Sequence, residues 1–186
     1  MTISTAKPSL LINATAAQFF PASSSADKVP KDLQSWLYSD GSLTALLEAR
    51  AGQPLRVQRT FEGYRPLTLL QKRQLGYQGA SLNRPMQAWV REVLLFGDDD
   101  EPWVAAQSLF PLPSLQGEAR RLQQLKGTPI GYVLFKRQRT LPNQRWVSLT
   151  AQGWQRQTRY DWYGRPILIS ETFLPRFMVN LCSVEV

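Results

Sequence analysis

Two residues of opposite charge interrupt apolar, strand-like segments of the sequence. Arg91 lies in residues 89–95 (WVREVLL), and Glu171 lies in residues 166–175 (PILISETFLP). Because side chains alternate along a strand, each charge shares its face with apolar neighbours, and Glu92 lies on the other face beside Arg91. Desolvation of a lone charge costs several kcal/mol. Arg91 and Glu171 therefore either form a buried ion pair or line a pocket for a charged ligand.

The composition limits the chemistry that such a site can use. The chain has no histidine, which excludes His-based triads, His-ligated metals and His general bases. Its one cysteine, Cys182, excludes an internal disulfide and a metal site built from cysteines. Catalysis would have to use carboxylates, Arg, Lys, Tyr or Ser, and we expect no metal.

The formal net charge of +8 favours an anionic partner, but it does not choose between nucleic acid, anionic lipid and a small acid. No nucleic-acid-binding motif accompanies the basic residues, which we interpret as mostly a solvated surface. They are Arg120, Arg121, Lys126, Lys136, Arg137, Arg139, Arg145, Arg156, Arg159 and Arg165. No apolar run approaches the ~20 residues of a membrane span, and the N-terminus lacks a secretory pattern, so we expect a cytoplasmic protein.

Alternation and turn residues predict the elements that position the two charges. Helices are expected from about residue 31, from Ser42 to Gly52, over 68–75, and from Ser114 as the N-cap to Gly127. Strands are expected over 54–61, 88–96, 103–110, 145–150, 156–163 and 166–174, with hairpin turns at 97–102 and Gly164. This order predicts an α+β fold with a six-stranded antiparallel sheet. We expect a flexible N-terminal tail over 1–30, one domain over 31–178 and a C-terminal tail over 179–186.

The turn at residues 127–131 (GTPIG) has two interpretations. Its glycines lack a Cβ, so its backbone N–H groups can approach an anion closely. It is also typical of a helix end followed by a turn back into the fold.

Four stretches, taken together, resemble the chorismate pyruvate-lyase family. They are residues 88–95 (AWVREVLL), 101–105 (EPWVA), 127–135 (GTPIGYVLF) and 154–175 (WQRQTRYDWYGRPILISETFLP). The resemblance covers residues 32–176. It implies a cofactor-free lyase that converts chorismate to 4-hydroxybenzoate and pyruvate for ubiquinone or plastoquinone synthesis, with helical flaps closing over a buried ligand.

The resemblance also implies roles for particular residues. Arg91 matches the ligand-binding arginine of the family, and Glu171 matches its catalytic glutamate. Leu43 and Ile130 match two positions that contact the ligand through the backbone. A monomer acting on a small molecule, with no nucleic acid and no membrane span, is expected.

These residue types suit the chemistry without histidine. Arginine offers a permanently charged fork for one of the two carboxylates of chorismate. Glu171 would protonate the departing ether oxygen if it were neutral, and the sequence does not decide whether its apolar face or a nearby arginine sets its charge. Gln157 and Thr158 stand where the family often has arginine and serine, and Leu43 replaces a methionine-like residue. The alternative function is a non-catalytic module of the same fold that binds small aromatic acids.

Overall fold

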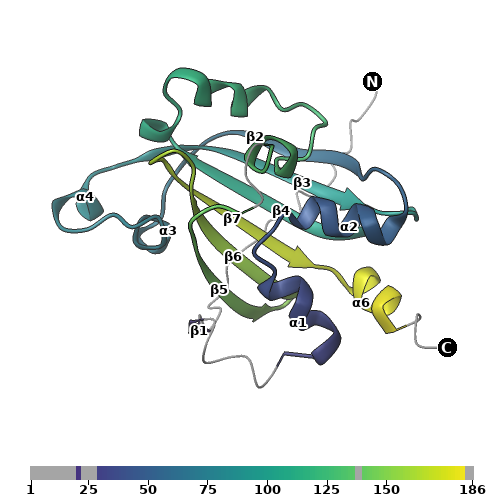
Figure 1. The fold of residues 1–186 in the computed structure, drawn as a ribbon. Coiled ribbons are helices and arrows are strands. Elements are labelled where there is room, and N and C mark those ends of the chain that lie inside the picture. Colours follow the sequence, from purple (N-terminus) through teal and green to yellow (C-terminus); the bar gives the residue numbers. More distant parts are fainter. Residues whose placement is uncertain (1–19, 22–28, 137–139, 183–186) are drawn as a thin grey trace, which may run out of the picture.

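One antiparallel sheet forms the centre of the protein. A computed structural model describes residues 20–21, 29–136 and 140–182. The strand order is β1-β5-β6-β7-β4-β3-β2 (Figure 1). The strands are β1 (Phe20–Pro21), β2 (Arg56–Pro66), β3 (Gln87–Phe96), β4 (Pro102–Pro111), β5 (Asn143–Thr150), β6 (Gly153–Asp161) and β7 (Pro166–Phe173). The predicted six-stranded antiparallel sheet is confirmed, and the two-residue β1 adds a short pairing at its β5 edge.

Helices precede, interrupt and follow the strands. They are α1 (Lys31–Tyr38), α2 (Leu43–Ala51), α3 (Leu69–Gln74), α4 (Ala80–Asn83), α5 (Gly131–Leu134), α6 (Pro175–Cys182) and the 3₁₀ segments η2 (Leu112–Ser114) and η3 (Gly117–Gln124). The predicted limits of α2 are confirmed, because the Ser42 hydroxyl accepts a hydrogen bond from the Ala45 N–H and Gly52 ends the helix with a φ of 66°.

Two of the sequence predictions about helices differ from the structure. Ser114 is not an N-cap: it belongs to η2, its hydroxyl donates to the Pro166 carbonyl, and Gln116 precedes η3 instead. The segment is a 3₁₀ helix that starts at Gly117, whose positive φ of 59° suits glycine. Helix α6 continues to Cys182, beyond residue 178, at which we expected the domain to end.

The hairpins set the register of the sheet. In the β3–β4 hairpin, Arg91 lies opposite Ser108. In the β6–β7 hairpin, whose turn places Tyr163 and Gly164 at positive φ, Arg156 lies opposite Glu171. Strand β7 also pairs with β4, which places Ala106 opposite Glu171. Because directly paired residues share a face, these residues all project from one side of the sheet, here called the inner face.

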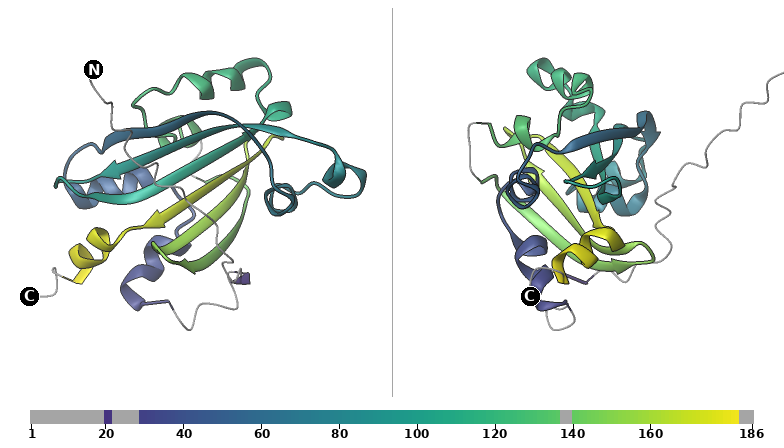
Figure 2. Two further views of the ribbon diagram at one scale, coloured as in Figure 1. Left: turned by 180° about the vertical axis from the view of Figure 1, so that it is seen from behind. Right: turned by 90° about the vertical axis from the view of Figure 1, so that its right-hand side faces the viewer.

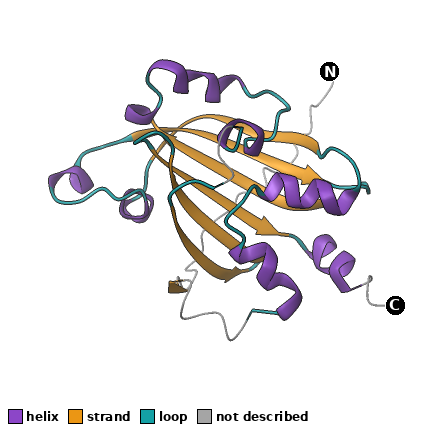
Figure 3. Ribbon diagram, viewed as in Figure 1, coloured by secondary structure: helices purple, strands orange, loops and turns teal. Residues whose placement is uncertain are grey.

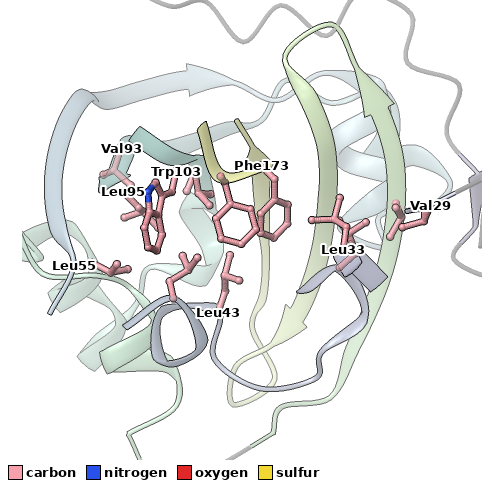
Figure 4. Close-up of a cluster of buried hydrophobic side chains, with 14 residues drawn as sticks. Val29, Leu33, Leu43, Leu55, Val93, Leu95, Trp103 and Phe173 are labelled. Atoms are coloured by element: carbon pink, nitrogen blue, oxygen red, sulfur yellow. The ribbon is translucent and has the colours of Figure 1, made fainter. Parts of the chain in front are cut away.

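Helices cover the inner face in two groups, each with its own apolar cluster (Figure 3). Helices α1 and α2 pack over one end, where Leu33, Leu43, Trp103 and Phe173 belong to the first cluster (Figure 4). Segments η3 and α5 pack over the other end and form the second cluster with β4, β6 and β7. Complete burial of a large apolar side chain stabilises the fold by about 1.5–3 kcal/mol, so these contacts hold the helices on the sheet.

The remaining helices lie at the edges of this arrangement. Helix α6 packs its Phe177 ring against Trp36, Trp103 and Phe173 of the first cluster. Helices α3 and α4 project from one end of the sheet, as the front and rear views both show (Figures 1 and 2). A third apolar cluster, which includes Leu75, Val90 and Leu168, covers part of the outer face. Within the described ranges, no helix has the length and apolar character needed to cross a membrane.

Candidate active site

A band of polar side chains crosses the inner face between the two apolar clusters. On β3, Arg91 separates Trp89 of the second cluster from Val93 of the first, and on β7, Glu171 similarly separates Ile169 from Phe173. We call this band the polar belt, and its members are Arg91, Ser108, Glu171, Arg156, Thr158 and Arg145. All six are buried except Arg145, whose side chain is still only 6% exposed. Charged and hydroxyl groups thus occupy buried positions in the middle of the inner face.

Arg91 is 2% exposed and is held on three sides. Its Nε donates to Glu62 Oε1 at 3.1 Å, and its Nη2 donates to the carbonyls of Lys126 at 2.8 Å and Thr128 at 3.1 Å. Burial lowers the pKa of Arg91, while the Glu62 carboxylate opposes that shift. These bonds use Nε and Nη2, and Nη1 makes no hydrogen bond within the described part of the chain.

Glu171 pairs with Arg156 rather than with Arg91. The Arg156 Nε donates to Glu171 Oε2 at 2.6 Å, and Arg156 is completely buried. The interpretation that Arg91 and Glu171 form one buried ion pair is therefore wrong, because each has its own partner. Their strands, β3 and β7, lie on either side of β4, so their backbones are about 10 Å apart.

Small side chains separate the two charges. Strand β4 places Ala106 opposite Glu171 and Ser108 opposite Arg91 on the inner face. Both are buried, and neither carries more than one heavy atom beyond Cβ. Arg91 and Glu171 therefore lie on either side of two small side chains, which leave the inner face shallow between them.

The N-terminal ends of α2 and α5 meet above the belt; we call residues 42–51 and 127–135 the flaps. A Cβ on Gly131 would lie 2.5 Å from Thr44 Oγ1 and 2.7 Å from Ser42 Oγ, so only glycine permits this approach. The Tyr132 hydroxyl donates to Glu48 of α2, and this hydrogen bond raises the pKa of Tyr132.

The structure places the predicted flap residues next to this junction. Leu43 is buried in the first cluster, immediately before Thr44, and Ile130 is half-buried against the second, immediately before Gly131. The 127–131 turn directs the Thr128 carbonyl at Arg91, which neither interpretation of that turn anticipated.

Arg145 and Arg156 were misjudged from the sequence as solvated surface. Both guanidinium groups are buried, and both donate through Nη1 to the carbonyl of Ser39, at 2.5 Å and 3.4 Å. Arg145 Nε also donates to Thr158 Oγ1 at 3.0 Å. The burial of Arg156 could have been predicted from the sequence, because Arg156 lies on the same face of β6 as the aromatic residues Trp154 and Tyr160.

Glu62 was also missed, for a different reason. The predicted strand ended at residue 61, whereas β2 continues to Pro66 and pairs Glu62 with Arg91. A bulge between Arg59 and Phe61 shifts the register there, so simple alternation does not reveal which face Glu62 occupies.

The outer face also carries a buried carboxylate. Glu92 accepts hydrogen bonds from Arg65 at 2.5 Å and from Gln107 at 2.9 Å. A pocket of about 400 Å³ opens nearby, with Leu94, Ala105 and Pro175 among its mostly apolar lining. Arg91 and Glu171 do not line this pocket. The buried, partnered charges favour the polar belt over this pocket as the site for an anionic ligand.

No cluster of three or more potential metal ligands occurs among His, Cys, Asp and Glu of the described residues.

A helix-covered antiparallel sheet with a belt of charges beneath the helices defines an α+β protein with an enclosed polar site. The family model described as chorismate lyase matches residues 15–181, and the chain belongs to this family.

Curated relatives carry corresponding names. The chain is 74% identical over 141 residues to a "Probable chorismate pyruvate-lyase" of Psychrobacter arcticus, covering 76% of this chain and 84% of the relative. It is 40% identical over 146 residues to the protein of that name from Acinetobacter baumannii, covering 78% and 83%. It is 32% identical over 148 residues to the "Chorismate pyruvate-lyase" of Pectobacterium atrosepticum, covering 79% of each chain.

Proposed function

We propose that this chain eliminates pyruvate from chorismate to give 4-hydroxybenzoate, a precursor of the quinone ring. Membership of the chorismate lyase family supports the reaction. The observation that carries the assignment of the site is the placement of Arg91 and Glu171 on one buried face, on either side of Ala106 and Ser108. A flat ring lying over these two small residues would have a cation at one end and a carboxylate at the other.

Arg91 binds the ring carboxylate in this proposal. Glu62 and the two flap carbonyls fix the plane of its guanidinium group, so little side-chain entropy remains to be lost on binding. Nη1 is the nitrogen left to donate to the ligand. A charge-assisted hydrogen bond of this kind contributes about 1.5–3 kcal/mol.

Glu171 acts at the opposite edge of the ring, as a carboxylate. Its Oε2 is held by the Arg156 guanidinium at 2.6 Å, while Oε1 has no hydrogen-bond partner among the described residues. In the reaction the ring C–O bond breaks, the neighbouring ring carbon loses a proton, and the enolpyruvate carbon gains one to form pyruvate. In this proposal Oε1 accepts the ring proton and contacts the hydroxyl group that the product retains. This assignment replaces the neutral, proton-donating Glu171 considered from the sequence.

The flaps exclude water and complete the binding site. Leu43 and Ile130 contribute backbone contacts, and the α2–α5 junction keeps them above the belt. Aromatisation drives the reaction, so positioning and exclusion of water are the main requirements. We further propose that the enzyme works as a cytoplasmic monomer without a metal or cofactor.

Incubation of the purified protein with chorismate and a chelator tests the proposal. Chromatography is expected to show equal amounts of 4-hydroxybenzoate and pyruvate. Arg91→Ala and Glu171→Gln should remain folded, as judged by circular dichroism, and lose most of this activity. Arg73→Gln, which removes an exposed charge on α3, serves as the control. Absence of turnover by a wild-type protein that still binds 4-hydroxybenzoate would favour the non-catalytic binding module.

A further inference from the structure

The β5–β6 side of the polar belt holds more positive than negative charge. The side chains of Arg145 and Arg156 are 6% and 0% exposed, whereas Glu171 is the single buried carboxylate beside them in the part of the chain that the structure describes. Asp40 lies 3.9 Å from Arg145, but its side chain is 72% exposed and therefore compensates little of that charge. One buried positive charge thus remains without a buried counter-charge among the described residues.

Both guanidinium groups also have an unused donor. Nη2 of Arg145 and Nη2 of Arg156 are buried and have no hydrogen-bond partner within the described residues. Buried donors are nearly always satisfied, and an exception needs an explanation. The groups are neighbours, because both donate through Nη1 to the Ser39 carbonyl. Burial and the charge of Arg156 lower the pKa of Arg145, which a bound anion would counteract.

The position of this excess charge matches the substrate. Across the inner face the order is Arg91 on β3, the small residues of β4, Glu171 on β7, Arg156 on β6 and Arg145 on β5. Chorismate carries one carboxylate on its ring and a second on the enolpyruvyl group that departs. With the ring carboxylate on Arg91, the departing group starts from the Glu171 edge and extends towards β6 and β5.

We propose that the Nη2 groups of Arg145 and Arg156 bind the enolpyruvyl carboxylate of the substrate and then the pyruvate product. This inference rests on the proposed function. The other product, 4-hydroxybenzoate, has a single carboxylate, which Arg91 binds, and so makes no use of the Arg145–Arg156 pair. The pair therefore distinguishes the substrate from the aromatic product.

A purely structural role for Arg145 makes a different prediction. Through Ser39 and Thr158 the side chain also links the α1–α2 segment to the sheet. If that were its only role, its loss would loosen the flap over every ligand and would weaken chorismate and 4-hydroxybenzoate binding alike.

The test compares Arg145→Gln with wild-type protein and with Arg73→Gln, an exposed-charge control of the same substitution type. For Arg145→Gln, we expect the KM for chorismate to rise about tenfold or more, the Kd for 4-hydroxybenzoate to stay unchanged and competitive inhibition by pyruvate to disappear. Arg73→Gln should change none of these. A parallel loss of affinity for both ligands, or no loss for either, would overturn the inference while leaving the lyase assignment intact. Failure of wild-type protein to convert chorismate would instead overturn the proposed function, and the inference with it.

A measurement on wild-type protein keeps the inference testable if Arg145→Gln does not fold. Pyruvate and 4-hydroxybenzoate should bind simultaneously, because they occupy different ends of the belt. Calorimetric titration of pyruvate into protein saturated with 4-hydroxybenzoate should still show binding. Complete displacement of pyruvate by 4-hydroxybenzoate would contradict separate subsites.

Discussion

Arg91 is oriented by three hydrogen bonds that a lysine could not make together. Its Nε and Nη2 make three hydrogen bonds, to Glu62 and to the carbonyls of Lys126 and Thr128, which leaves the third nitrogen in a fixed position. A lysine carries a single ammonium on a flexible stem and cannot contact all three acceptors and a ligand from one plane.

We predict that Arg91→Lys weakens 4-hydroxybenzoate binding by about 10- to 100-fold, because it removes a charge-assisted hydrogen bond. Isothermal titration calorimetry measures the change, with Arg73→Lys as the control at an exposed site. Unchanged affinity would show that the Arg91 fork does not bind the ligand.

The sequence identified Arg91 and Glu171 as unusual because a charge among apolar neighbours can be recognised within one strand. It could not identify their partners. Glu62 precedes Arg91 by 29 residues and Arg156 precedes Glu171 by 15, and each pairing depends on the register between strands. That register is set by turns, by a bulge and by packing of the helices, none of which a single strand encodes.

The flaps depend on close contact between two short elements. Gly131 lies at the α2–α5 junction, where an added methyl group would collide with Thr44 and Ser42. Gly127, at the start of the same flap, has nothing within 4 Å of an added Cβ and offers a matched control.

Gly131→Ala should therefore separate the flaps, lower stability by about 1–3 kcal/mol and speed release of 4-hydroxybenzoate. Thermal melting and stopped-flow dissociation would measure both effects. Gly127→Ala should leave both near wild type, and equal behaviour of the two variants would contradict a closed flap junction.

Helix α6 is linked to the β3–β4 turn by a carboxylate. Asp99 accepts hydrogen bonds from Arg176 Nε at 2.6 Å and Asn180 Nδ2 at 3.3 Å. Burial opposes the shift, but these hydrogen bonds lower the pKa of Asp99 below its ordinary 3.8. The contact therefore stabilises the fold fully above that pH and is lost as the pH falls through the lower, folded-state pKa.

We predict that Asp99→Asn lowers the melting temperature slightly at pH 7, on the order of 2 °C, because a partly exposed ion pair contributes little. The difference from wild type should shrink when melting is repeated below pH 4. A difference that persists in acid would show that the carboxylate charge is not its cause.

The element predictions succeeded where local chemistry sets the boundary and failed where packing does. The side chain of Ser42 caps the start of α2, and the backbone of Gly52 adopts the positive φ that ends it. Both ends of the helix can therefore be predicted from the sequence. Ser114 has the right chemistry for a cap, but its hydroxyl is used by the Pro166 carbonyl of a strand 52 residues away. Helix α6 was missed because it is organised around Phe177, whose ring packs on nearby Phe173 and on Trp36 and Trp103 from distant segments.

The whole molecule combines a net charge of +8 with a site for a dianionic substrate. Long-range attraction should raise the association rate, and salt screens it beyond a Debye length of about 10 Å at 0.1 M. We predict that kcat/KM for chorismate falls as the ionic strength is raised while kcat changes little. Steady-state kinetics in a salt series would measure this, and a kcat/KM independent of salt would rule out electrostatic steering.

The proposed site for a small aromatic acid is the polar belt beneath the flaps, and the alternative is the apolar pocket beside Glu92 on the outer face. A crystal structure with 4-hydroxybenzoate would show which of these two sites binds the ligand. We predict the ring over Ala106 and Ser108, with its carboxylate on Arg91 Nη1 and its hydroxyl at Glu171 Oε1. Density for the ligand in the outer pocket, with the belt unchanged, would contradict the account.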